Sequence, residues 1–319
     1  MSGVVLALLG CVRSGPPAAA GDEVHAERRP FAPMVDGTPV TRGISYGPFR
    51  RGQAPGGPNP SEAEILQDLQ IIAERWSMIR TYGAGEPTET IIRTIRDHDL
   101  PLVIMVGAWI QPEDAAERER EVADAIRLAN AYPEQVVAVS IGNESQVSWS
   151  GHRTERSTLI GHLRAARQAV RQPVTTADDY NFWNKPQSHE VADLVDFVVL
   201  HAYAMWNGKS LDEAVSWTAD TYATIAAEHP GHQVVIGETG WATEMNPEGD
   251  EAQHILAPAG TAEQERFYDE LTEWAADSDV VYFYFEAFDE PWKGSEDPRE
   301  VEKHWGLFDV DRRPKPALR

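Results

Sequence analysis

Short apolar runs recur along the chain, and each is too short for a buried helix and rich in β-branched residues. Runs of this kind are typical of strands covered on both faces, as in a parallel sheet. From residue 41 onward they lie at 43–46, 78–82, 102–109, 136–141, 174–177, 197–204, 234–236 and 280–285. The pattern therefore predicts eight buried strands.

Amphipathic stretches with apolar residues at helical spacing separate most of these runs. They cover residues 61–76, 87–98, 112–131, 155–171, 211–228 and 261–276. Three begin at a capping-box pattern, in which a hydroxyl and an acid or amide satisfy free backbone donors: Ser61 with Glu64, Ser210 with Glu213, and Thr261 with Gln264. Strands and helices alternating in this way close most simply into a (β/α)8 TIM barrel of the α/β class. We expect one such domain over residues 39–319.

Residues 1–38 differ in composition from the rest of the chain. Leu8-Leu9-Gly10-Cys11 ends an apolar segment and resembles a bacterial lipobox, at which signal cleavage leaves a lipidated cysteine. The segment lacks a positively charged start and is short for a signal peptide, so a fortuitous apolar stretch is the alternative. Residues 12–38, rich in Pro, Ala and Gly, have the composition of a flexible tether. We expect an exported protein of the cell envelope or extracellular space, anchored through Cys11, rather than a simple secreted or cytoplasmic form.

Charge and cysteine content narrow the possible partners. The chain has 28 Lys and Arg against 51 Asp and Glu, a formal net charge of −23, which repels nucleic acid and anionic membranes at long range. A neutral polysaccharide is unaffected by this charge. The single Cys11 excludes an internal disulfide, and no Cys/His group has zinc spacing. We expect a monomer with no cofactor, no metal and no nucleic-acid partner.

Two of the predicted strands end in a glutamate. Glu144 follows the run at 136–141, and Glu238 follows the run at 234–236. A lone carboxylate at such a position is costly, but a parallel barrel delivers the carboxyl ends of all its strands to one face. Two facing carboxyl groups are what glycosidic bond cleavage needs. The alternative, two salt-bridged strand ends with no chemistry, is disfavoured by the paired placement.

The segments around these glutamates resemble a known family. The arrangement of the two glutamates, with an asparagine directly before Glu144, resembles clan A of the glycoside hydrolases. Five further motifs resemble glycoside hydrolase family 17, the β-1,3-glucanase family, in its bacterial and fungal branches: IRTYG at 79–83, HAY at 201–203, GETGW at 237–241, YFEAFDEPWK at 284–293 and HWGLF at 304–308. The likeness covers residues 41–316. The chain departs from the family at Ala242, where a proline is usual.

The resemblance implies a role for each matching residue. Glu144 is the expected acid/base, Glu238 the expected nucleophile, and Asn143 the partner of the sugar 2-hydroxyl. The other residues expected to bind substrate are Tyr46, Arg80, Tyr82, Asp179, Trp183, Tyr203, Trp206, Trp241, Glu290, Trp292 and Lys293. The four tryptophans fall just beyond predicted strand ends, where their rings can stack on sugars, although any one of them can instead pack in the core. Arg80 and Tyr82 are also expected to orient the Glu238 carboxylate. A surface ion pair is the alternative for Glu290 with Lys293, and interior packing is the alternative for Tyr82.

The implied activity is a retaining, endo-acting β-1,3-glucan hydrolase of laminarinase type. A transglycosylase using the same site is the first alternative, because a covalent glycosyl-enzyme can pass its sugar to water or to another glucan. The insertion at 47–60 can shape the acceptor site. A non-catalytic surface protein that binds glucan is the alternative from a different class.

Overall fold

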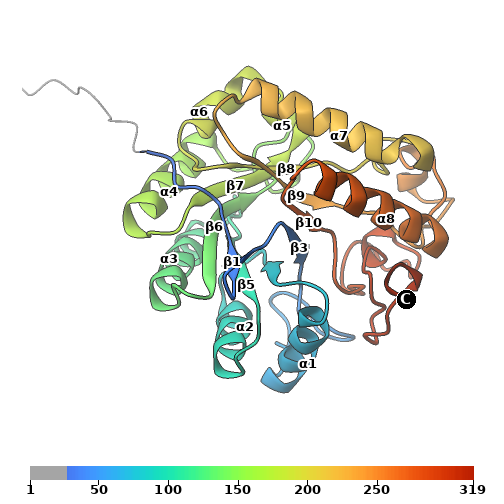
Figure 1. The fold of residues 1–319 in the computed structure, drawn as a ribbon, viewed down its shortest axis with the longest axis horizontal. Coiled ribbons are helices and arrows are strands. Elements are labelled where there is room, and N and C mark those ends of the chain that lie inside the picture. Colours follow the sequence, from blue (N-terminus) through green and yellow to red (C-terminus); the bar gives the residue numbers. More distant parts are fainter. Residues whose placement is uncertain (1–26) are drawn as a thin grey trace, which may run out of the picture.

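The eight predicted strands form one closed parallel barrel. The computed structural model describes residues 27–319, and its barrel has the order β10-β3-β4-β5-β6-β7-β8-β9 (Figure 1). All neighbouring strands pair in parallel. The strands are β3 (Arg42–Ser45), β4 (Met78–Arg80), β5 (Val103–Ala108), β6 (Val136–Asn143), β7 (Val174–Asp179), β8 (Val198–His201), β9 (Val234–Thr239) and β10 (Tyr282–Tyr284). The predicted TIM barrel is confirmed.

Helices cover the outside of the barrel, as Figure 1 shows. All six predicted helices form, and two short helices, α5 and α6, join β7 to β8. The bounds are α1 (Glu62–Ala73), α2 (Glu86–Asp97), α3 (Ala115–Ala131), α4 (Arg156–Ala169), α5 (Tyr180–Trp183), α6 (His189–Ala192), α7 (Leu211–Glu228) and α8 (Thr261–Asp277). In the described chain, β10 is followed by the 3₁₀ turns η3 (Val301–Lys303) and η4 (Pro316–Leu318) instead of a long helix.

Two of the three predicted capping boxes form, at Ser61 and Ser210. The third is wrong, because Gly260 is the N-cap of α8. Gln264 is fully buried, and its amide donates to the backbone carbonyls of Trp241 and Gly306. Gln264 therefore joins two loops on the carboxyl side of the barrel.

Alternate residues along the strands belong to two different apolar clusters. Met78, Met105 and Val199 belong to the cluster inside the barrel, whereas Ile79 and Leu200 belong to the cluster beneath the helices. Side chains two residues apart on a strand share a face. Arg80 and His201 follow Met78 and Val199 at this spacing, so both project inward above the core.

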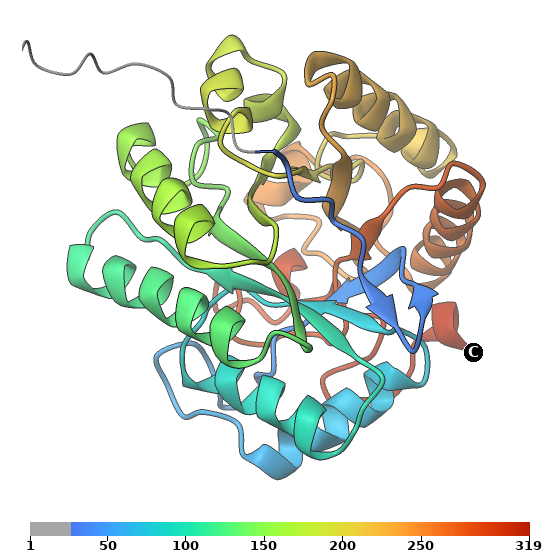
Figure 2. The ribbon, with the colours of Figure 1, turned by 60° about the vertical axis from the view of Figure 1, so that its left-hand side comes forward.

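The first described residues pack against the amino ends of the strands. Phe31 is buried and stacks on Phe197, which directly precedes β8, with ring centroids 4.5 Å apart. Arg29 forms an ion pair with the buried Asp196 at 2.6 Å. The antiparallel pair β1 (Met34–Val35) and β2 (Thr38–Pro39) follows (Figure 2). The expected tether through residue 38 is therefore wrong for residues 29–38.

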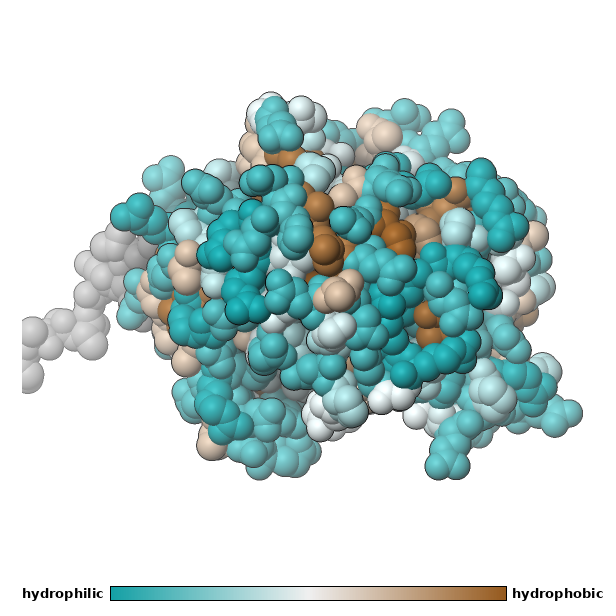
Figure 3. Space-filling view, turned by 90° about the horizontal axis from the view of Figure 1, so that it is seen from below, coloured by the Kyte–Doolittle hydropathy of each residue, from teal (hydrophilic) through white to brown (hydrophobic). Residues whose placement is uncertain are grey.

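The lipobox-like segment around Cys11 lies outside the described residues. Among the residues that are described, no helix is long and apolar enough to cross a membrane. Figure 3 shows mostly hydrophilic residues on one face, with apolar residues in small separate patches, as the acidic composition suggests.

One buried aspartate ties the end of the chain to the first helix. Asp68 of α1 accepts two hydrogen bonds from Arg312, at 2.9 and 2.8 Å. It also accepts one from Arg50 at 2.5 Å and one from the Tyr46 hydroxyl at 3.2 Å. The network joins α1, the loop after β3 and the C-terminal segment behind the carboxyl face of the barrel.

Replacing Asp68 by asparagine should lower the free energy of unfolding by about 3–5 kcal/mol, because the Arg312 charge stays buried without its partner. The Arg312 side chain is only 3% exposed. Urea denaturation measures the change. The control is Asp311→Asn. The pair of Asp311 with Arg51 is exposed, with 44% of the Asp311 side chain and 67% of the Arg51 side chain accessible, and should contribute less than about 1 kcal/mol. Equal, small losses in the two variants would contradict this reading of the network.

Candidate active site

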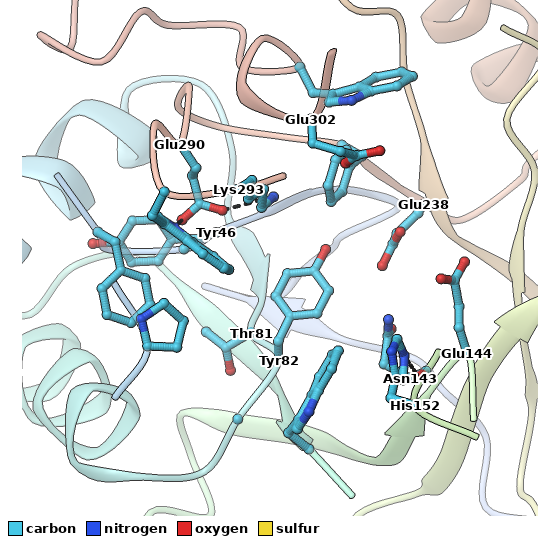
Figure 4. A pocket seen from close by; sticks show the side chains of 18 of the residues that line it. Tyr46, Thr81, Tyr82, Asn143, Glu144, His152, Glu238, Glu290, Lys293 and Glu302 are labelled. Atoms are coloured by element: carbon cyan, nitrogen blue, oxygen red, sulfur yellow. Dashed lines mark hydrogen bonds and ion pairs between the residues drawn. The ribbon is translucent and has the colours of Figure 1, made fainter. Parts of the chain in front are cut away.

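A cavity of about 1170 Å³ opens at the carboxyl ends of the strands. Its walls come from the loops after nearly every strand, including residues 46–49 after β3 and Glu290, Trp292 and Lys293 after β10. Figure 4 shows Glu144 and Glu238 side by side in it, with their carboxyl groups turned toward each other. Functional sites of TIM barrels lie at this end of the fold.

The backbone at the end of β6 is bent so that Glu144 enters the cavity. The pairing of β6 with β7 shifts register between Ser140 and Asn143. Gly142 has φ +83°, and Glu144 has φ +47°, in a left-handed region that non-glycine residues seldom adopt. A hydrogen bond from the Glu144 amide to the Ala177 carbonyl at 2.9 Å holds this geometry. Such a local irregularity re-aims a side chain next to a site.

His201 lies between the two glutamates. Its Nδ1 is 3.0 Å from Oε1 of Glu144, and its Nε2 is 3.4 Å from Oε1 of Glu238. One oxygen of each glutamate and one His201 nitrogen all lie within 4.8 Å of one another. These three residues are also the donor set that a cation would use. The Arg80 guanidinium already contacts Glu238, so a metal ion would bind against a positive charge.

Glu238 is surrounded by hydrogen-bond donors. Arg80 donates to Oε1 at 2.6 Å, and the Tyr203 hydroxyl donates to Oε2 at 2.7 Å. Burial favours the neutral acid, but His201, Arg80 and Tyr203 outweigh it and lower the pKa of Glu238 to about 2. Burial lowers the pKa of His201 to about 4, so His201 is neutral near pH 7. Arg80 and Tyr203 therefore keep Glu238 ionised there.

Glu144 has the opposite electrostatic environment. Burial and then the nearby charges of Glu238 and Asp179 raise its pKa well above the usual value. Neutral His201 can accept a hydrogen bond at Nδ1 from the protonated Glu144. Two neighbouring carboxyl groups with pKa values pushed apart are typical of an acid and a nucleophile.

Arg80 orients the Glu238 carboxylate, as expected, and is a positioning residue and not a substrate contact. Arg80 is buried, and its guanidinium bonds both Glu238 and the Asn143 side chain. It does not line the cavity, whereas Asn143 does. Arg80 thus fixes Asn143 relative to Glu238.

Most of the other expected binding residues line the cavity. These are Tyr46, Tyr82, Asp179, Tyr203, Trp206, Glu290, Trp292 and Lys293. The Tyr46 hydroxyl is turned away, toward Asp68, so only its ring can face a ligand. Asp179 also caps α5 by accepting from the Asn181 amide at 2.8 Å. Glu290 and Lys293 form a pair at 2.8 Å with side chains 3% and 15% exposed, so the exposed surface ion pair is excluded.

Two of the expected tryptophans are in the core, and their assignment to the cavity rim is wrong. Trp183 is fully buried and donates to the Val199 carbonyl at 2.9 Å. Trp241 is fully buried, donates to the Pro258 carbonyl at 3.0 Å and packs on Phe267. In each case the indole N–H finds a backbone partner in the interior.

Several lining residues were not anticipated from the sequence. Trp149, 58% exposed, follows Glu144 by five residues. Trp109 ends a predicted strand and lies over His152, with ring centroids 4.5 Å apart. Phe49 meets Trp292 edge to face at 5.9 Å. Glu302 also lines the cavity, and burial raises its pKa to about 7. The signal for Trp149 and Trp109 was their nearness to strand ends.

A parallel barrel with two neighbouring carboxyl groups at its carboxyl face is the arrangement that glycoside hydrolases use. The family model described as the BtgE/BtgC glycoside hydrolase domain matches residues 43–306. The chain belongs to this family, and the recognition drawn from its motifs is confirmed.

Relatives and solved structures agree with this placement. The chain is 28% identical to "Glucan 1,3-beta-glucosidase" of Arthroderma benhamiae, over 82% of this chain and 86% of the relative. It is 25% identical to "Glucan endo-1,3-beta-glucosidase btgC" of Emericella nidulans, over 81% of this chain but only 42% of the relative. An endo-laminarinase from Formosa is similar in structure, with TM-score 0.77 and 25% identity over 86% of this chain and 85% of that one.

A family 17 β-1,3-glucanosyltransferase from Rhizomucor miehei has TM-score 0.71 and 22% identity, with 86% of this chain and 95% of that chain covered. That likeness concerns the fold.

Proposed function

We propose that the chain is a retaining, endo-acting β-1,3-glucan hydrolase. The observation that carries the mechanism is the spacing of Glu144 and Glu238, whose nearest oxygens lie within 4.8 Å. Retaining enzymes hold their carboxyl groups about 5–5.5 Å apart, whereas inverting enzymes need about 6.5–9.5 Å to admit a water molecule. The short spacing of these oxygens supports the retaining arrangement.

The reaction proceeds in two displacements at this pair. In the first, the Glu238 carboxylate attacks the anomeric carbon while Glu144 gives its proton to the leaving oxygen, and a glycosyl ester forms on Glu238. In the second, the Glu144 carboxylate takes a proton from water, and the resulting oxygen nucleophile displaces Glu238. Asn143, held by Arg80, is placed to bond the sugar 2-hydroxyl.

The cavity supports a polymeric substrate bound in mid-chain. Exposed rings line it on separate loops, Trp149 after β6 and Trp292 after β10. Such rings stack on the apolar faces of sugars, and several stacked sugars supply the orientation that the bond cleavage needs. The names of the relatives point to β-1,3-glucan as the polymer.

Fresh digests of laminari-oligosaccharides, followed by proton NMR beside cello-oligosaccharides, test the proposal. We expect the new reducing end to appear first as the β-anomer, because two displacements restore the starting configuration, and we expect the laminari series to react faster. Initial α-anomer would overturn the retaining mechanism. Faster cleavage of the cello series would overturn the substrate assignment alone.

Transglycosylation is the second candidate, and the exposed Trp149 favours it. Its loop follows Glu144 directly, so its ring is placed to hold an acceptor sugar. Products longer than the substrate, detected by mass spectrometry, would identify transfer. A non-catalytic glucan-binding role is disfavoured by the intact carboxyl pair, and a failure to release reducing ends from laminarin would revive it.

Export and lipid anchoring through Cys11 remain part of this proposal, as does a monomeric state. The Leu8-Leu9-Gly10-Cys11 pattern supports the export and the lipid anchor. Metabolic labelling with a fatty acid should mark the full chain and leave its Cys11→Ser variant unmarked. Labelling of both proteins, or of neither, would contradict the anchor.

Arg80→Met should shift the acid limb of the pH profile of kcat/KM upward. Arg80 lowers the pKa of Glu238, so without it the nucleophile takes up a proton at a higher pH and activity is lost sooner on acidification. Arg80→Lys, which keeps a charge but cannot bond two partners with the same fork, should shift the limb less. An acid limb unchanged in the methionine variant would contradict this role.

A further inference from the structure

Two buried carboxyl groups share one ammonium beside the cavity. Lys293 Nζ lies 2.8 Å from both oxygens of Glu286 and 2.8 Å from Oε2 of Glu290. The Glu286 and Glu290 side chains are 1% and 3% exposed. Two ionised carboxylates would leave an unbalanced negative charge in the interior, which is unfavourable.

The contacts of the two carboxyl groups are unequal. Glu290 accepts from Lys293 and also from the Trp292 indole at 3.1 Å, and it lines the cavity. Glu286 does not line the cavity, and Lys293 is its only side-chain donor among residues 27–319. Donors therefore reach both oxygens of Glu290, whereas Glu286 depends on Lys293 alone, so Glu286 is the group that keeps a proton.

The other charged and titratable groups near the pair do not change this balance. Lys315 is held by Asp289 at 2.8 Å, and Glu302 faces Lys293 from η3. The Tyr82 hydroxyl is held by Arg80, from which it accepts a hydrogen bond at 3.3 Å. Burial and then Glu290 raise the pKa of Glu286 well above its usual value, although Lys293 opposes them.

We propose that Glu286 is a positioning residue, a carboxylic acid that donates its proton to Glu290 and thereby fixes the Lys293 ammonium at the cavity wall. Lys293 Nζ also lies 4.4 Å from the centroid of the Phe285 ring, which lines the same wall. Gly47 leaves room for this arrangement, since a Cβ there would lie 2.1 Å from Oε1 of Glu290. The site then presents one fixed cation and one carboxylate to sugar hydroxyls.

Infrared difference spectra at pH 7 test the protonation without any need for activity. Wild type minus Glu286→Gln should contain the carbonyl stretch of a protonated carboxylic acid. Wild type minus Glu290→Gln should contain it as well, because the remaining Glu286 then ionises as the sole partner of Lys293. A net loss of carboxylate absorption in either variant would overturn the proposal, because it would mean that the substitution had removed an ionised group. The second variant also keeps the test decisive if the first does not fold.

Kinetics on laminari-oligosaccharides then locate the proton, in a readout that rests on the proposed function. Glu290→Gln should lower kcat/KM by about 10- to 100-fold, as expected for loss of a charged hydrogen-bond partner. Glu286→Gln imitates the protonated acid and should lose at least about tenfold less. The reverse order would overturn the assignment of the proton to Glu286. Should no laminari substrate react, the infrared result still decides the protonation while the proposed function fails.

Discussion

Glu238→Ala should lower kcat by about 10⁶, the scale seen when a catalytic nucleophile is removed. No other described carboxylate lies within bonding reach of both Arg80 and Tyr203, so no side chain takes over the attack. The loss should be the same on polysaccharide and on substrates with good leaving groups, because neither can form the glycosyl ester. Initial rates with laminarin and with an aryl glycoside measure it.

Loss of catalysis in Glu238→Ala must be distinguished from misfolding, because Arg80 loses its ion pair in this variant. Glu238→Gln keeps an acceptor for Arg80 and should be as inactive while melting close to wild type. Glu270→Ala is the matched control, since Glu270 is 41% exposed in its pair with Arg266 on α8 and far from the cavity in sequence and fold. Residual activity above about 1% in Glu238→Gln would contradict the role of Glu238, because loss of the nucleophile costs far more than that.

The barrel could be predicted because each strand is an apolar run bounded by a helical pattern. Both signals are local, and they also place Glu144 and Glu238 at strand ends. Arg80 and His201 follow from the same reasoning, since alternation along a strand fixes which side chains point inward.

What the sequence could not reveal depends on contacts between distant segments. Trp183 and Trp241 follow strands as Trp206 does, but their indoles bond Val199 and Pro258 in the interior. Phe31 and Phe197 stack on each other but lie far apart in the sequence, so their contact could not be predicted. The Pro and Ala residues around Phe31 therefore suggested a tether. Glu286 stood inside a recognised motif, yet only its contact with Lys293 reveals its role.

Glu144→Ala should lose activity selectively, which distinguishes an acid/base from a nucleophile. Cleavage of polysaccharide should slow by about 10²–10⁴, the usual contribution of general acid catalysis. An aryl glycoside with a good leaving group needs no proton, so its first step should be nearly unaffected and the second step should become limiting. Azide, a small anion that needs no general base, should then accelerate turnover and yield a β-glycosyl azide.

The same variant should remove the alkaline limb of the pH profile. In the wild type that limb marks the loss of the Glu144 proton, and because the pKa of Glu144 is raised by burial and by Glu238, activity persists above the usual carboxyl range. The acid limb, set by Glu238 with its pKa near 2, should remain. Equal losses on polysaccharide and aryl glycoside would mean that another group supplies the proton. An alkaline limb that survives the substitution would mean the same. Glu302, which lines the same cavity and has a pKa of about 7, would then be the residue to replace next.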